Sequence, residues 1–91
     1  MNFQIRWSHM ALGALGQFWL DYPQQRSSIN AGASKLDELL RVDPADQGES
    51  RGVESLRILF VPPLVITYKV NEPDLLVQVL NVRFLKRRGL D

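Results

Sequence analysis

The sequence predicts a single α+β domain, residues 1–91, in which a hairpin of two N-terminal helices packs on one face of a mostly antiparallel four-stranded sheet. The chain has 91 residues, which suits one domain and is too short for two. Its first half carries apolar residues at three- and four-residue spacing, whereas its second half carries three short runs rich in β-forming residues. Because one helix pair covers only one side of a sheet, the other side is expected to be open.

The first strand and first helix are predicted from a change of period near Ser8. Phe3 to Trp7 alternates apolar and polar residues, which indicates a half-buried strand. Ser8 suits a helix N-cap, since its hydroxyl can accept a hydrogen bond from a free amide of the first turn. The helix that follows has one apolar stripe, which we expect to be core: Ala11, Leu12, Leu15, Phe18, Trp19 and Tyr22.

A second helix is predicted from about Gln24 to Arg41, after the turn that Pro23 permits. Asp43-Pro44 should end it, because a residue before proline is disfavoured in the helical region. The polar stretch from Asp43 to Glu54 reads as a surface loop with at most a short extended piece.

Three strands are predicted at 56–61, 64–70 and 75–82, and their short connections imply antiparallel hairpins. Residues 83–91 are expected to form a basic tail beyond the sheet. Alternation places Tyr68 with Leu64 and Ile66, on the core side. It also puts Arg57 on the side of Leu59, and Lys69 on the side of Thr67 and Val65, which predicts a concave and partly basic open surface.

Composition excludes several kinds of site. The chain has no cysteine, so it has no disulfide, thiolate metal site or cysteine nucleophile. Its single histidine, His9, is expected to be a surface residue, since one imidazole makes neither a metal site nor a triad. No cofactor or metal is expected. The sequence shows no signal-peptide pattern and no apolar run long enough for a membrane helix, so a soluble cytoplasmic protein is expected.

Charge is unevenly distributed although the net charge is only +1. Residues 37–54 contain six acids and two bases, whereas residues 55–91 contain six bases and three acids. The near-neutral total argues against a general nucleic-acid binder, whose affinity rests on many phosphate contacts. The run Lys86-Arg87-Arg88 is either a solvated tail or an anion-binding edge, because adjacent cations raise the local affinity for phosphate.

The order and spacing of several short motifs resemble the RelE/ParE toxin superfamily, the plasmid-stabilisation toxins of type II toxin–antitoxin systems, over almost the whole chain. The matching segments are Ile5-Arg6-Trp7-Ser8-x-x-Ala11-Leu12-x-x-Leu15, Ala33-x-x-Leu36-x-x-x-Leu40, Asp43-Pro44-x-x-x-Gly48, Leu56-Arg57-x-Leu59-x-Val61-x-Pro63-Leu64-x-x-x-Tyr68-x-Val70, Val77-x-Val79-Leu80-x-Val82 and Lys86-Arg87-Arg88.

This resemblance implies a toxin that either cleaves mRNA on the ribosome without a metal or poisons DNA gyrase, and that a cognate antitoxin protein neutralises. It implies catalytic roles for Arg57, Arg83 and Arg87, because fixed cations stabilise the charge that a phosphorane gains. The resemblance also implies that the target is bound by Lys69, Lys86 and Arg88.

The sequence departs from the family pattern at its basic end. Many members carry a histidine beside the arginines and a late tyrosine, but this chain has Phe84-Leu85-Lys86-Arg87-Arg88 and no tyrosine after Tyr68. A general acid or base is therefore missing there, which weakens the ribonuclease interpretation more than the gyrase one. The alternative is a degenerate homologue that keeps the fold and acts only as an interaction module.

Overall fold

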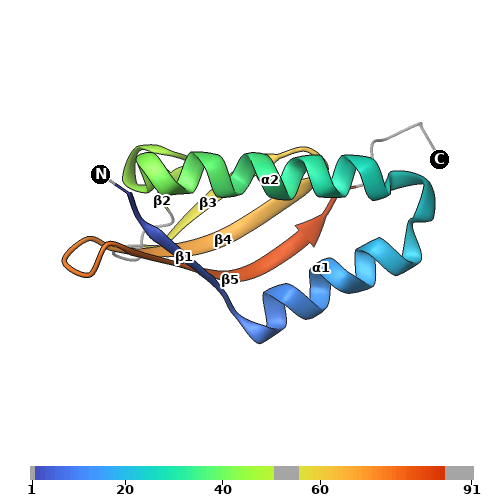
Figure 1. Cartoon of the computed structure of the whole chain (residues 1–91), viewed down its shortest axis with the longest axis horizontal. Helices are drawn as coiled ribbons and strands as arrows, with labels where there is room; N and C mark the ends of the chain where they lie inside the picture. Colours follow the sequence, from blue (N-terminus) through green and yellow to red (C-terminus); the bar gives the residue numbers. More distant parts are fainter. Residues whose placement is uncertain (1, 51–55, 86–91) are drawn as a thin grey trace.

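The computed structural model describes residues 2–50 and 56–85 of the chain (Figure 1). Its two long helices are α1, His9–Asp21, and α2, Arg26–Val42. Short 3-10 turns, η1 and η2, span Pro23–Gln25 and Pro44–Asp46. The strands are β1 Gln4–Trp7, β2 Glu49–Ser50, β3 Leu56–Val61, β4 Leu64–Asn71 and β5 Leu76–Phe84.

All strands belong to one mixed sheet with the order β1-β5-β4-β3-β2. β1 runs parallel to β5, and the remaining neighbours are antiparallel. The N-terminal strand reaches β5 because α1 and α2 separate it from the hairpins in sequence, which leaves it free to pair at the far edge (Figure 1). The predicted helix hairpin on a four-stranded sheet is confirmed. The two-residue β2 is the short extended piece expected after α2.

The core lies between the helices and one face of the sheet. Leu36 and Leu40 of α2 are fully buried there, and so is Ala11 of α1. The sheet contributes the residues that alternate toward the helices, which are Leu59, Leu64, Ile66, Tyr68, Val77, Val79 and Val82. No helix of the described ranges 2–50 and 56–85 is long and apolar enough to cross a membrane.

The start of α1 is fixed to β5 through Ser8. The Ser8 hydroxyl oxygen accepts a hydrogen bond from the Ala11 amide at 3.0 Å, as predicted for an N-cap. The same hydroxyl donates to the Leu80 carbonyl at 3.0 Å, and the Ser8 amide donates to the Val79 carbonyl at 2.9 Å. One side chain therefore sets both where the helix begins and how it sits on the sheet.

The apolar stripe of α1 is only partly core, which corrects the prediction. Ala11 is buried, and Leu15 and Phe18 pack against the core from its margin, but Leu12 is 52% exposed and Trp19 is 39% exposed. Leu12 and Trp19 are seven residues apart, which places them on one side of the helix, turned away from β5. The Arg26 guanidinium lies 3.9 Å from the Trp19 ring centroid and partly covers it.

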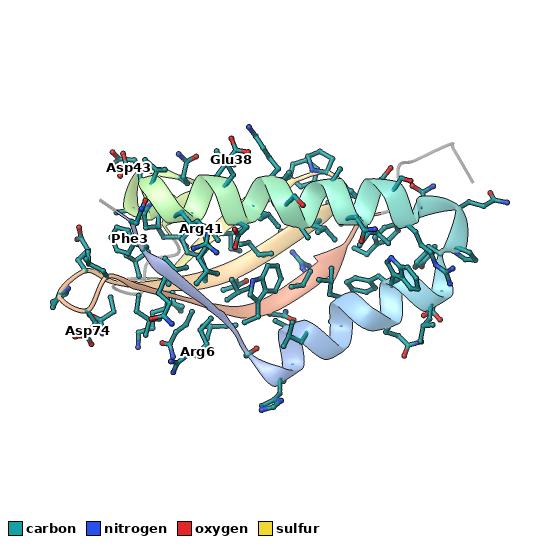
Figure 2. The ribbon with its side chains drawn as sticks, in the orientation of Figure 1. Phe3, Arg6, Glu38, Arg41, Asp43 and Asp74 are labelled. Atoms are coloured by element: carbon teal, nitrogen blue, oxygen red, sulfur yellow. The ribbon has the colours of Figure 1, made fainter. Side chains whose placement is uncertain are left out.

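α2 begins two residues later than predicted, because Pro23–Gln25 forms a 3-10 turn first. Its buried residues Ile29, Gly32, Leu36 and Leu40 recur at three- and four-residue spacing. The helix ends at Val42, before Asp43-Pro44, as predicted. The Phe3 amide donates to the Arg41 carbonyl at 2.8 Å, so the end of α2 is joined to the start of the sheet (Figure 2).

β5 continues through Phe84, so the prediction that residues 83 and 84 belong to a tail is wrong. Its pairing with β4 shifts by one residue: Thr67 lies opposite Asn81 but Tyr68 lies opposite Val79, which leaves Leu80 as a bulge. The bulge reverses the alternation, and Phe84 therefore faces the helices. Its ring stacks on Tyr22 at a centroid distance of 4.4 Å and lies 5.6 Å from Phe18.

We predict that Ser8→Ala lowers the free energy of unfolding by about 1 to 2 kcal/mol, because the variant loses the N-cap and the bond to Leu80. Ser34→Ala is the matched control, since Ser34 is exposed within α2 and the change there should slightly stabilise the helix. Urea denaturation followed by circular dichroism measures both. Equal stabilities for the two variants would contradict the role given to Ser8.

Candidate nucleic-acid interface

The open face of the sheet is defined by strand pairing, because directly opposed residues on neighbouring strands point to the same side. Leu59 pairs with buried Ile66, so these two residues lie on the helix side. Lys69 belongs to the opposite set on β4, which also contains Thr67 and Val65. We refer to this second side, away from α1 and α2, as the open face.

Arg57 does not lie on the open face. It pairs with Tyr68, which is fully buried beneath the helices. Arg57 and Leu59 do share a side, as predicted, but that side is the one the helices cover. The expectation that Arg57 joins Lys69 on a basic open surface is therefore wrong, because the register of β3 against β4 was not available from the sequence.

The Arg57 guanidinium instead binds the loop that follows α2. Its Nε donates to the Gln47 carbonyl at 2.7 Å, and its Nη2 donates to the Gly48 carbonyl at 3.1 Å. The Tyr68 hydroxyl lies 2.8 Å from the Pro44 carbonyl and 2.6 Å from the Gln47 carbonyl, and its single proton is shared between these two acceptors. Burial raises the pKa of the Tyr68 phenol, which keeps it a protonated donor, although nearby Arg57 acts in the opposite direction.

Gly48 completes this arrangement, which we term the loop lock: Arg57, Tyr68 and the backbone of 44–48. Gly48 has a φ of +67°, a conformation that favours glycine. A Cβ at this position would also collide with the Ile58 carbonyl oxygen. The loop is thus held against β3 by side-chain donors from two strands and by a close backbone approach. The two hydrogen bonds to the Gln47 and Gly48 carbonyls give Arg57 a structural role that requires no ligand.

Lys69 and Arg83 are the predicted site residues that do lie on the open face. Arg83 pairs with Val65, four positions from Lys69 on β4, so the two cations are roughly 14 Å apart along the strand. Both side chains are exposed. Within residues 2–50 and 56–85, neither makes a hydrogen bond or an ion pair. Lys86, Arg87 and Arg88 lie outside the described residues.

Three further residues of the open face were not predicted as site residues. Arg6 of β1 lies opposite Gln78 of β5, and Gln78 lies opposite Lys69. Phe60, which is 54% exposed, pairs with Val65 and so shares a row with Arg83. Alternation along β1 places Arg6 on the other face of the strand from Ile5 and Trp7, and this pattern could have predicted its exposure. Nothing in the sequence predicts the parallel pairing that brings Arg6 beside β5.

A shallow hollow of about 490 Å³ adjoins Lys69 at the β4–β5 hairpin. Gln78, Arg57 and Glu72 also line it. The hollow therefore carries two cations and one acid, with an amide between them. Such a mixture suits a polar or anionic group better than an apolar ligand.

Among the residues described, no tyrosine or histidine lies on the open face, and Glu72 is the carboxylate that lines the hollow beside Lys69. Tyr68 is buried on the helix side, Tyr22 stacks on Phe84 there, and His9 is exposed at the start of α1. No cluster of metal-ligating side chains occurs in 2–50 or 56–85. The geometry thus provides fixed positive charge, which stabilises bound phosphate or developing negative charge.

We expect Gly48→Ala to lower the free energy of unfolding by more than about 1 kcal/mol, because alanine is strained at positive φ and its Cβ meets the Ile58 carbonyl. The matched control is Gly13→Ala. A Cβ at Gly13, within α1, meets nothing within 4 Å, so this change should stabilise the protein by about 0.5 to 1 kcal/mol. Opposite shifts of the urea midpoint are expected, and a stabilising Gly48→Ala would refute the loop lock.

Arg57→Gln should cost about 1 to 3 kcal/mol of stability, because two partly buried carbonyls lose a charged donor. Arg83→Gln removes the same charge from an exposed side chain and should change stability by less than about 0.5 kcal/mol. Equilibrium denaturation compares the two. If both variants were as stable as the unaltered protein, the structural role given to Arg57 in the loop lock would be wrong.

No protein-family model and no curated protein matches the sequence. Solved structures do match. A chain of the chromosomal ParDE system from P. aeruginosa aligns with a TM-score of 0.75 at 15% identity, covering 92% of this chain and 97% of the other. A chain of the RelBE2 toxin–antitoxin complex from Mycobacterium tuberculosis gives 0.76 at 14% identity, with 92% of each chain covered.

The isolated RelE toxin of E. coli aligns with a TM-score of 0.64 at 17% identity, covering 99% of this chain and 90% of the toxin. At identities this low, the shared fold is established by the arrangement of helices and strands and not by shared residues. The same helix hairpin and sheet span nearly all of each partner, so the likeness is not confined to a fragment. This chain has the RelE/ParE-like toxin fold.

Proposed function

We propose that this protein is the toxin component of a type II toxin–antitoxin system and is neutralised by a cognate antitoxin protein. The observation that carries the proposal is the match over 92% of the chain to structures of the ParDE and RelBE2 systems. One further match is an E. coli RelE variant bound to a peptide of its antitoxin RelBc. The size and element order of this chain fit the toxin side of such a pair.

The open face is the proposed target-binding surface. Arg83 is exposed on it without a partner among the described residues, and its guanidinium is proposed to hold a phosphate or the charge of a transition state. Arg87 is proposed to assist it, and Lys69, Lys86 and Arg88 to bind the target's anionic groups. For Arg57 we propose a positioning role: through the loop lock it holds the loop after α2 against β3.

Two targets remain within this proposal, ribosome-bound mRNA and DNA gyrase. Cleavage of mRNA is aided by a general base, and neither tyrosine nor His9 of the described chain lies on the open face. A ribonuclease that relied on charge alone would lose roughly 10²- to 10⁴-fold in rate. Gyrase poisoning needs no such group. Either target places the protein in the cytoplasm.

A second candidate function is an interaction module that keeps the fold but has no toxicity. Two observations favour it. Arg57 is engaged by backbone carbonyls in the loop lock, and the described part of the open face carries cations without a tyrosine or histidine beside them. Such a module would still bind an antitoxin-like protein, because the surfaces needed for that contact do not depend on catalysis.

Inducible expression in a bacterial host tests the toxin proposal. We expect growth arrest, rescue by co-expression of the neighbouring reading frame, and at least a tenfold recovery of colony formation with Arg83→Ala, because that change removes an exposed cation of the open face that we propose to be catalytic. Lys35→Ala is the control, since Lys35 is exposed on α2 beside Glu38.

Purified protein then separates the targets, through mRNA cleavage on translating ribosomes and supercoiling by gyrase. Activity in either assay that Arg83→Ala abolishes would exclude the inert module. No growth defect together with co-purification of the neighbouring protein would support the module and overturn the toxin. Absence of both toxicity and complex formation would overturn both functions.

A further inference from the structure

Three polar residues form one transverse row across the open face. Arg6 of β1 pairs with Gln78 of β5, and Gln78 pairs with Lys69 of β4. Neighbouring strands are about 4.8 Å apart, so the two cations start roughly 10 Å from each other with the amide midway between them. Figure 2 shows Arg6 extending from β1 away from α2. We term these three residues the cationic row.

The cationic row has unused binding capacity. Arg6 and Lys69 are exposed, and neither side chain forms a hydrogen bond or ion pair with any residue of the described ranges. Gln78 likewise has no hydrogen bond to a described residue through its side chain, although it is only half-exposed. Its neutral amide separates two like charges that would repel each other on directly opposed positions. An anion above Gln78 would contact both cations and the amide donor.

The other end of the open face has a different character. Phe60 is 54% exposed, and its row continues through Val65 to Arg83. The distance from this row to the cationic row is about 14 Å along β4, a span that a few nucleotides of a single strand cover. An exposed ring on the same face as spaced cations fits single-stranded nucleic acid, because a base stacks on the ring while phosphates meet the charges.

We propose that Arg6, Gln78 and Lys69 bind a phosphodiester of a single-stranded nucleic acid, and that a base of the same strand stacks on Phe60. This inference rests on the proposed function for the class of target and deepens it by assigning Arg6, Gln78 and Phe60, which the family resemblance does not imply, beside Lys69. Arg6 supplies a planar fork of donors, Lys69 a point charge, and Gln78 an amide hydrogen bond.

Glu72 opposes this site. It lines the hollow beside Lys69 and Gln78, where its carboxylate repels a phosphate. Its position makes the charge argument testable in both directions, since removal of a cation and removal of this acid should change affinity with opposite signs. An apolar or merely solvated face would show neither response.

Binding of the full chain to fluorescein-labelled ten-nucleotide RNA and DNA single strands, followed by anisotropy at several salt concentrations, tests the proposal. Arg6→Gln and Lys69→Gln are each expected to weaken binding about tenfold and to lower the slope of log affinity against log salt by about 0.7, the value for one lost phosphate contact on a single strand. Glu72→Gln should tighten binding roughly twofold.

Phe60→Ala should weaken binding by about 5- to 100-fold while leaving the salt slope unchanged, because stacking releases no counterions. The controls remove the same groups elsewhere: Lys35→Gln takes a charge from α2, and Leu12→Ala takes an exposed apolar side chain from α1. Both should bind like the unaltered chain. Circular dichroism and urea midpoints confirm that each variant is folded.

Row variants that bind as well as Lys35→Gln would overturn the inference, and so would a glutamate-rich peptide that binds as tightly and with the same losses. Tighter binding to RNA than to DNA identifies RNA as the ligand, and equal binding identifies the shared phosphodiester backbone. Growth arrest with unaffected row variants would overturn only the cationic row. Binding lost in the row variants without any growth arrest would overturn only the toxin proposal.

Discussion

The parallel pairing of β1 with β5 is the constraint on which the rest of the structure depends. It joins the first strand of the chain to the last, with Ile5 opposite Val77 and Trp7 opposite Val79. The intervening α1 and α2 must then pack on a single side, because both lie in the connection between β1 and the hairpins. The opposite side is left without a helix. The same pairing places Arg6 beside Gln78, so the architecture and the proposed phosphate site have one origin.

A second feature governs which cations are available to a ligand. Arg57 and Lys69 lie on neighbouring strands, yet the first is engaged by backbone carbonyls and the second has no described partner. The loop lock engages Nε and Nη2 of Arg57, so the position of this guanidinium is fixed by the protein's own backbone. Among the residues described, the exposed cations without a described partner lie on β1, β4 and β5.

The bulge at Leu80 decides the orientation of the last strand. Regular alternation from Val79 would turn Arg83 toward the helices and Phe84 toward solvent. The one-residue shift between Thr67 and Tyr68 reverses both directions, so Phe84 stacks on Tyr22 and Arg83 reaches the open face. Ser8 donates to the Leu80 carbonyl at this point, which ties the irregular residue to the start of α1. A local irregularity thus determines the proposed role of an arginine three residues away.

The sequence by itself determined the elements: the Ser8 cap, the stop at Asp43-Pro44, the bounds of β3 and the buried position of Tyr68 all follow from local propensity and alternation. The tertiary structure alone decided which face each strand turns to the helices, where Arg57 points, how little of α1 is covered, and that Arg6 meets Gln78. The reason is physical. Capping and periodicity act within a few residues, whereas register, bulges and parallel pairing are set by contacts between segments distant in the chain.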